Sequence, residues 1–453
     1  MNSTLVKWTV AAAWLATAVA ARAQDSTTQR RSLKDCISYG LAHHKSVQVA
    51  QNNIETAHQQ AREQLAAYLP QVNVTAGLDY NLKLAQNIIP AGSFPSQTEE
   101  MRIQFGTKYA STQVIQLDQK IFDKSLLTGL KANSSNNQLA ELNAEQNNQD
   151  LIYNISYAYY QILVTQKQLD LLYGNKERFE KILKVTRLQA EQGVVKKVDV
   201  KQVQVNLNNV LAQISVAENN LKLSQNTLNN YMGLPQGAVL QLTDTARWLA
   251  VSPNAGASSN FDYRQSVSYQ LQATQIKMYD INRQSIRDQV YPTLSVYGRY
   301  GANGFGQESI WKCYDPLLDY SAIGLKLSWS LFTGFRRSAQ YKQAYIDLEN
   351  ARINLKLNED RQRLQYENAG VAVTRARTNI STNKQNMDLA GEVYENTTLQ
   401  YRQGMATLSD LLNAENSYRE AQNNYIASLL DFYLAYLDVQ KANGTLRQYY
   451  QQL

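Results

Sequence analysis

The stretch Leu188-Gln-Ala-Glu-Gln-Gly193 has a counterpart in Leu399-Gln-Tyr-Arg-Gln-Gly404, and this pair decides how the rest of the chain is interpreted. The two stretches are identical at four positions, and each glycine is followed six residues later by an aspartate, Asp199 or Asp410. The flanking sequence on both sides repeats at matching offsets. Self-similarity over such a distance indicates an internal duplication. We therefore predict two repeats, each with one copy of this stretch.

Long helices are expected on both sides of the two glycines. No proline lies between Pro95 and Pro235 or after Pro316, so these parts lack the strongest helix breaker. Residues 124–191 and 334–402 each predict one helix, the first about 100 Å long at 1.5 Å per residue. The helices that return after Gly193 and Gly404 alternate spacings of four and three between seam residues, which predicts coiled-coil packing. Their seams begin Val203, Leu207, Val210, Ile214 and Ala414, Tyr418, Ala421, Tyr425.

Four shorter segments alternate apolar and polar residues, as strands between two different solvents do. The predicted strands cover about residues 71–81 and 112–122 in repeat one, and 293–301 and 322–332 in repeat two. The apolar side chains expected to face a membrane are Val72, Val74, Leu325, Leu327 and Trp329. The opposite faces carry Asp79, Arg299 and Lys326.

The length of these strands suits a membrane β-barrel, which needs strands of roughly 9–11 residues. Four strands cannot close a barrel, and an open edge in lipid leaves backbone hydrogen bonds unmade. Two copies of the chain would supply eight strands and three copies twelve, and larger barrels leave a lumen that suits the polar faces. We predict a mainly α fold with a membrane β-barrel that several chains build together, continued away from the membrane by a tube of long helices.

The N-terminus and the region between the repeats have distinct compositions. Residues 1–23 predict a signal peptide, with the basic Lys7, an apolar run from Trp8 to Ala20 and a small-residue cleavage site at Ala21-Arg22-Ala23. A membrane anchor is the alternative, although the apolar run is short for a span. Residues 24–239 form repeat one, 240–260 an equatorial connector and 261–453 repeat two.

Composition argues against other classes of protein. Removing Lys7 and Arg22 lowers the formal net charge from +7 to +5, and the scattered charges predict no nucleic-acid partner. Three histidines in polar helical segments predict no metal site. We find no nucleophile elbow, phosphate loop or paired catalytic carboxylates, so we expect neither an enzyme nor a cofactor. Whether Cys36 and Cys313 form a disulfide stays open.

The order of elements resembles that of the TolC-type outer-membrane efflux proteins over essentially the whole mature chain. The resemblance is carried by Leu69-Pro70 and Tyr291-Pro292 before the first strand of each repeat, by the strand ends Ile121-Phe122 and Leu331-Phe332, and by the turn from Tyr401 to Asp410. It implies a homotrimer in contact with outer-membrane lipid, with a twelve-stranded barrel, a periplasmic α-helical barrel and an irregular belt around it. The localisation would be the cell outer membrane, with a large periplasmic portion.

The resemblance also implies partners and a function. The chain would be the passive exit duct of a tripartite efflux or type I secretion system, opened by a periplasmic adaptor protein and an inner-membrane pump of the proton-driven or ABC type. A structural periplasmic coiled-coil protein without a pore is the alternative. It accounts for the heptads and the export signal, but not for the apolar strand faces.

Residues at the second turn match a gate in this family, where rings of aspartate narrow the periplasmic mouth. Asp410 matches the first ring position, and Asn413 occupies the second. Tyr401 and Asp199 match two members of a closing contact, whereas Ala406 stands at its arginine position. A Tyr401–Asp199 hydrogen bond is then possible but the ion pair is not, which gives the hypothesis of a looser or differently latched gate. The alternative is that Asp199 and Asp410 only stabilise helix N-termini.

The two turns are also the predicted docking surface for the adaptor. Gly193 and Gly404 can adopt positive φ, which permits a tight reversal. Lys196, Lys197 and Arg402 surround them. A solvated charged turn without a partner is the alternative.

Overall fold

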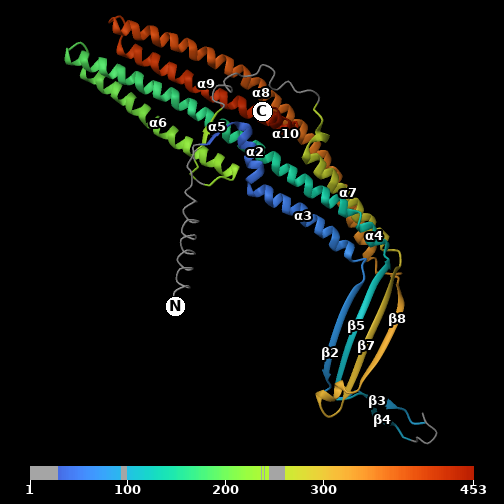
Figure 1. Cartoon of the computed structure of the whole chain (residues 1–453). Helices are drawn as coiled ribbons and strands as arrows, with labels where there is room; N and C mark the ends of the chain where they lie inside the picture. Colours follow the sequence, from blue (N-terminus) through green and yellow to red (C-terminus); the bar gives the residue numbers. More distant parts are fainter. Residues whose placement is uncertain (1–28, 93–98, 236, 239, 244–260) are drawn as a thin grey trace, which may run out of the picture. The chain divides into compact units, whose positions relative to one another are not determined.

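The computed structural model describes residues 29–92, 99–235, 237–238, 240–243 and 261–453 (Figure 1). The predicted signal peptide and most of the predicted connector lie outside these residues. The chain divides into two compact units. Unit 1 contains the described residues up to Gln51 together with Ala144–Tyr269 and Asn358–Leu453, and unit 2 contains Asn52–Asn143 and Gln270–Leu357.

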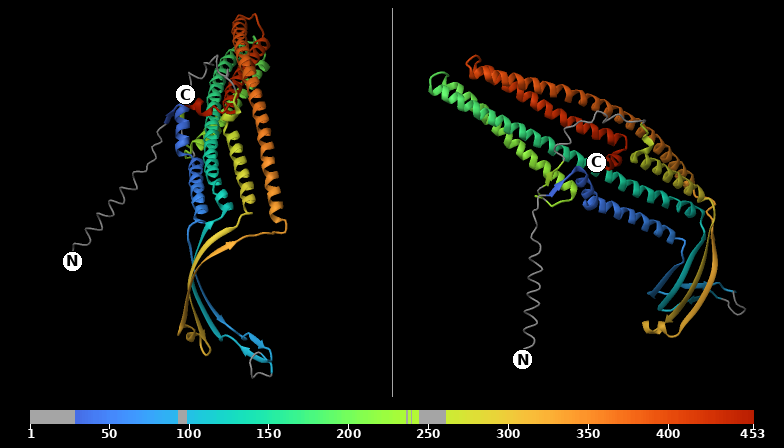
Figure 2. Two further views of the ribbon diagram at one scale, coloured as in Figure 1. Left: turned by 90° about the vertical axis from the view of Figure 1, so that its right-hand side faces the viewer. Right: turned by 45° about the horizontal axis from the view of Figure 1, so that its top comes forward.

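Unit 1 is built from long helices that lie side by side in the views of Figures 1 and 2. They are α5 (Ala132–Glu191), α6 (Lys197–Met232), α8 (Arg336–Arg402) and α9 (Leu408–Ala442), of which α5 and α8 extend into unit 2. Most of the predicted seam residues are buried, which confirms the spacing argument, whereas Tyr418 and Ala421 are only partly buried. The buried seam residues are Val203, Leu207, Val210, Ile214, Ala217 and Leu228 in α6, and Ala414, Tyr425, Ser428, Phe432, Ala435 and Val439 in α9.

Shorter elements complete the chain. They are β1 (Gln29–Arg31), α2 (Leu33–His43), α3 (Lys45–Ala66), α4 (Lys124–Gly129), β6 (Leu240–Leu242), the 3-10 helices η2 (Tyr263–Gln265) and η3 (Ile310–Tyr314), α7 (Val267–Asp288) and α10 (Leu446–Gln452). In unit 1, the hydroxyls of Tyr160 and Tyr449 join α5 to α10 at 2.8 Å within the apolar core. A second cluster, around Phe179, Val210 and Leu411, packs α5, α6 and α9 together.

Unit 2 contains a twisted antiparallel sheet whose strand order is β2-β5-β7-β8 (Figure 2). The strands are β2 (Gln71–Tyr80), β5 (Tyr109–Phe122), β7 (Thr293–Gly306) and β8 (Leu317–Ser328), and a separate hairpin pairs β3 (Gln86–Ile89) with β4 (Met101–Gln104). In the described residues, β2 and β8 are the edges of the four-stranded sheet. Among those residues, no helix has both the length and the apolar character of a membrane span.

Two predicted boundaries of long elements are wrong. The helix expected over residues 124–191 is interrupted between Gly129 and Ala132. Glycine is a weak helix former, and Thr128 next to it donates a 2.6 Å hydrogen bond to Asp288 of α7, which fixes the short α4 separately. β7 continues past residue 301 to Gly306. This glycine-rich segment does not alternate apolar and polar residues, but pairing with β5 keeps it in the strand conformation.

The last predicted strand is also displaced. β8 covers Leu317–Ser328 instead of residues 322–332, so Trp329 lies just beyond the strand. Its indole N–H donates to the carbonyl of Val290 at 3.0 Å. The possible disulfide is not formed: Cys36 and Cys313 are both buried thiols, one in each unit.

Candidate functional site

Two tight turns end α5 and α8 at the same end of the unit 1 helices (Figure 1). Gly193 has φ +77° and Gly404 has φ +72°, the left-handed conformation that ends many helices. The next residue in each turn donates its N–H five residues back, Val194 to Gln189 at 2.8 Å and Met405 to Gln400 at 2.9 Å. A Cβ built on either glycine meets nothing within 4 Å, so the positive φ, not crowding, selects glycine here.

The surface of these turns combines charge with exposed apolar side chains. Lys196, Lys197 and Arg402 are exposed, as the sequence led us to expect. The sequence reasoning missed Val194 and Met405, which are 68% and 69% exposed. Each directly follows the turn glycine, and this position is the signal that could have identified them.

Both aspartates of the repeated stretch cap helices. Asp410 accepts a hydrogen bond from the backbone N–H of Thr407 at 3.0 Å, and the Thr407 hydroxyl accepts from the backbone N–H of Asp410 at 3.2 Å. Hydrogen bonds from the side chain and backbone of Thr407 lower the pKa of the Asp410 carboxyl. In the first turn, Asp199 accepts from the backbone N–H of Lys196 at 3.0 Å. The capping role, one of the two roles considered from sequence, is therefore present at both turns.

Tyr401 has a different partner from the one expected. Its hydroxyl is buried against α5, where it donates to Gln189 Oε1 at 3.0 Å and lies 3.4 Å from Thr186 Oγ1. Because Asp199 is bonded to its own helix N-terminus, the expected Tyr401–Asp199 hydrogen bond is replaced by a Tyr401–Gln189 bond in this chain. The distance between Gln189 and Tyr401 in sequence explains why spacing alone did not reveal the pair.

The other gate candidates lie together on the surface of the α8–α9 hairpin. Asp410 and Asn413 are exposed and line a shallow groove of about 400 Å³ with Ala406. The remaining groove residues are Val393, Thr397, Gln400, Met405, Ala414 and Ser417. The structure thus brings Asp410, Asn413 and Ala406 together, whereas Tyr401 is directed into the contact with α5.

One face of the sheet in unit 2 is apolar. The register pairs Val72 with Leu117, and residues paired across neighbouring strands share a face. Continuing this register through β7 places Ile323 on the same face as Val72. The exposed apolar residues of this face include Val72, Val74, Ile323, Leu325 and Leu327, between 61% and 84% exposed. An apolar surface of this kind marks contact with a membrane or another protein.

The opposite face is polar and contains two tyrosine–glycine pairs. Asp79, Arg299 and Lys326 lie on it according to the register. A Cβ on Gly301 would lie 2.7 Å from Tyr320 Cζ, and one on Gly324 would lie 2.7 Å from Tyr297 Oη. These tyrosine rings therefore cover the glycines opposite them. The alternation predicted both faces but not these pairs.

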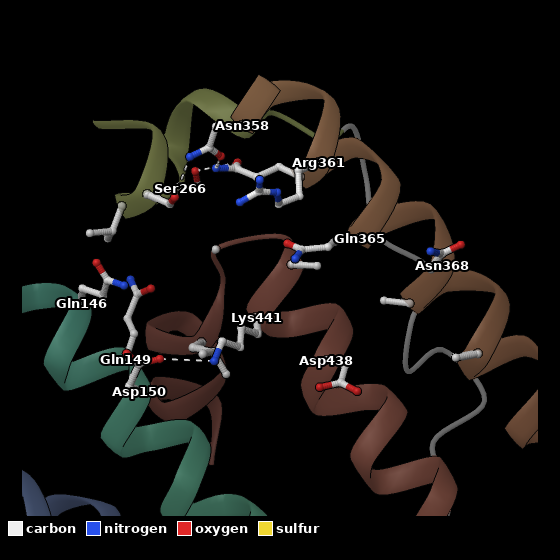
Figure 3. Close-up of a pocket in the computed structure, with 18 residues that line it drawn as sticks. Gln146, Gln149, Asp150, Ser266, Asn358, Arg361, Gln365, Asn368, Asp438 and Lys441 are labelled. Atoms are coloured by element: carbon white, nitrogen blue, oxygen red, sulfur yellow. Dashed lines mark hydrogen bonds and ion pairs between the residues drawn. The ribbon is translucent and has the colours of Figure 1, made fainter. Parts of the chain in front are cut away.

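A polar pocket of about 650 Å³ lies in unit 1 between α5, α8, α9 and the start of α7 (Figure 3). Its carboxylates are already engaged: Asp150 pairs with Lys441 at 3.2 Å, and Asp438 accepts from the Tyr153 hydroxyl at 2.7 Å. The other polar residues labelled there are Gln146, Gln149, Ser266, Asn358, Arg361, Gln365 and Asn368. Amides and engaged carboxylates do not make a nucleophile–base arrangement, so this pocket offers no catalytic chemistry.

Comparison with known proteins identifies relatives that match most of the chain. A family model described as "Outer membrane efflux protein" matches residues 36–234 and 269–445. The outer membrane protein TolC of Vibrio cholerae is 24% identical over 386 residues, covering 84% of each chain. The alkaline protease secretion protein AprF of Pseudomonas aeruginosa is 23% identical over 346 residues, covering 75% of this chain and 70% of AprF.

Solved structures show the same fold at low sequence identity. A crystal structure of CusC, from a study of transmembrane channel formation, gives a TM-score of 0.73 at 15% identity and covers 91% of this chain and 92% of CusC. The outer membrane protein VceC of Vibrio cholerae gives a TM-score of 0.71 at 17% identity, with 91% and 96% covered.

Proposed function

Because the chain belongs to the outer membrane efflux protein family, we propose that it is the passive exit duct of a tripartite efflux or type I secretion system. Members of this family are outer-membrane channels and not enzymes, and the chain is an outer-membrane protein. The finer proposal has three parts: three copies form one barrel, the helices continue it into the periplasm, and the tips meet an adaptor that links the duct to an inner-membrane pump.

The open sheet is the observation that carries this proposal. It has four strands, an exposed apolar face and two edge strands, β2 and β8. In lipid, unpaired backbone groups at such edges cost several kcal/mol each, so a spanning sheet must close. Pairing β8 of one copy with β2 of the next closes the sheet after three copies with twelve strands. The polar face, with Asp79, Arg299 and Lys326, then lines the lumen.

The two turns, at the ends of the long helices, support the periplasmic end of the duct and its contact with an adaptor. Exposed Lys196, Lys197 and Arg402, beside the apolar Val194 and Met405, suit docking of a helical partner through both charge and apolar contact. The groove with Asp410 and Asn413 would line the narrow end of the duct, with a ring of three carboxylates in a trimer. A purely structural coiled coil explains the heptads, but gives the apolar sheet face no partner.

Cross-linking across the sheet edges tests the assembly. Cysteines at Val72, Val74 or Ala76 in β2, each combined with Ile323→Cys in β8, sample several registers on the apolar face. We expect disulfide ladders that end at the trimer on denaturing gels. Ile115→Cys, on the same face of the central strand β5, replaces the β2 cysteine in the control and should give monomers. The native thiols are buried, so the parent chain is the background control.

Planar lipid bilayers test the duct itself. Purified trimers should produce stepwise conductance increases on insertion. A ladder that ends at the dimer or continues beyond the trimer would overturn the twelve-stranded barrel. Correctly assembled trimers that insert without conductance would support the structural alternative.

A further inference from the structure

A buried ion pair joins the α5–α6 hairpin to the α8–α9 hairpin within unit 1. Arg178 of α5 faces Glu415 of α9, with Nε 3.3 Å from Oε2 and Nη2 3.5 Å from Oε1. The Glu415 side chain is fully buried and that of Arg178 is 23% exposed. Arg178 also donates to Asn175 one helical turn away, which orients the guanidinium. Both carboxylate oxygens of Glu415 therefore face one guanidinium, the arrangement that arginine makes best.

Two tyrosines extend this contact to α8. The guanidinium carbon of Arg178 lies 5.4 Å from the ring centroid of Tyr394 and 5.0 Å from that of Tyr418. The rings are stacked, with centroids 6.0 Å apart and planes at 16°. A Cβ on Gly391 would lie 3.2 Å from Tyr418 Cε2, so the glycine leaves room for the Tyr418 ring. The cation, the carboxylate and the two rings, here called the Arg178 cluster, unite three helices.

The electrostatics indicate that the Arg178 cluster fixes how the α5–α6 and α8–α9 hairpins pack together, more than it adds to the free energy of folding. Burial raises the pKa of the Glu415 carboxyl, while Arg178 and Arg419 oppose this rise. Desolvation thus outweighs the attraction of the two guanidinium groups, as in many buried ion pairs. Such a pair is costly to break on one side only, so the two hairpins are held in one register.

Other polar contacts between the hairpins are more exposed. The side chains of the Lys441–Asp150 pair are 50% and 48% exposed, and those of Arg447–Glu145 are 67% and 28% exposed. Among the ion pairs that join α5 to α9 or α10 in the described residues, Arg178–Glu415 alone has a fully buried carboxylate. It lies about 16 Å along α5 from Gln189, the partner of Tyr401 near the tip. A movement of α8–α9 away from α5 that extends to this level would separate Arg178 from Glu415 and from the two rings.

We propose that the Arg178 cluster is a latch that keeps the α8–α9 hairpin against α5 and so sets the width of the tip opening. The inference rests on the proposed duct, because a latch has a function only if the tip end opens. Arg178 and Glu415 act as positioning residues, since neither lines the groove that contains Asp410.

The test measures conductance and unfolding of the same trimers. Glu415→Gln keeps the shape of the side chain but removes its charge, and we expect a several-fold rise in single-channel conductance or in the open fraction. Arg178→Lys keeps the charge but loses the paired geometry, and an intermediate rise is expected. The exchange Arg178→Glu with Glu415→Arg should restore low conductance in part. Asp150→Asn, which removes the exposed pair, is the matched control and should leave conductance unchanged.

The outcomes separate the latch from a simple structural role. If trimers of Glu415→Gln and Arg178→Lys assemble and their conductance stays at the wild-type value, the latch is wrong, whether the unfolding temperature falls, rises or stays unchanged. If Glu415→Gln fails to assemble, Tyr418→Leu, which weakens the cation–π contact without removing a charge, must raise conductance for the latch to stand. Wild-type trimers without conductance would refute the proposed duct itself, a result distinct from failure of the latch.

Discussion

The hydroxyl of Tyr401 offers a direct test of how the two hairpins are joined near their tips. Tyr401→Phe removes one hydrogen bond to Gln189 at 3.0 Å and a longer contact to Thr186 at 3.4 Å, and leaves the ring in place. A neutral hydrogen bond contributes about 0.5–1.5 kcal/mol net, so we expect Tyr401→Phe to lower the free energy of unfolding by about 1 kcal/mol. The ring itself is buried, so the apolar packing should persist.

A double-mutant cycle identifies the partner of this hydroxyl. Gln189→Met keeps the length of the side chain. The double variant Gln189→Met/Tyr401→Phe should lose about 1 kcal/mol less free energy of unfolding than the two single variants lose together, because both changes remove the same hydrogen bond. Asp199→Asn combined with Tyr401→Phe should be additive to within about 0.5 kcal/mol. Urea unfolding in detergent, followed by helical circular dichroism, measures both cycles. Coupling to Asp199 without coupling to Gln189 would refute the structural assignment and favour the bond expected from sequence.

Three further predictions concern the groove, the sheet and the ion pair. Asp410→Ala should raise conductance and weaken block by multivalent cations in bilayer recordings. Thr407→Ala removes the cap but keeps the carboxylate, so it should lower the free energy of unfolding by about 1 kcal/mol and leave conductance unchanged. Leu325→Arg should destabilise the inserted barrel by about 2–4 kcal/mol, and Lys326→Ala, on the opposite face, should alter ion selectivity without impairing insertion into vesicles. The pKa of the Glu415 carboxyl is raised above its ordinary value of 4.5 in the folded state, so the folded state binds the proton more tightly than the unfolded state does. The free energy of unfolding of the wild type, relative to that of Glu415→Gln, should therefore fall as the pH rises above 4.5. Unfolding at several pH values checks this sign, and a relative stability that rises over the same range would contradict it.

Local patterns predicted the elements well. The spacing of Val203, Val210 and Ile214 predicted a buried seam, because the helical repeat alone decides which residues share a face. Gly193 and Gly404 predicted the ends of the long helices, because few other residues adopt positive φ at low cost. The alternation around Leu325 predicted an exposed apolar face for the same geometric reason.

Boundaries were less predictable wherever a neighbouring element decided them. Gly306 is in a strand because β5 supplies its hydrogen-bond partners, although its own segment has no strand pattern. Trp329 continues the alternation of β8, but its indole bonds to Val290 beyond the strand end. In both places, tertiary pairing overrode the local preference.

By itself, the sequence determined the duplicated turn, the long helices and the two-faced strands, because each depends on residues within a few positions of one another. Only the tertiary structure decided which polar groups meet across the helices. Tyr401 bonds Gln189 instead of Asp199, and Arg178 meets Glu415 from a distant part of the chain. Spacing carries no information on such pairs, because burial and the packing of neighbouring helices select the partners.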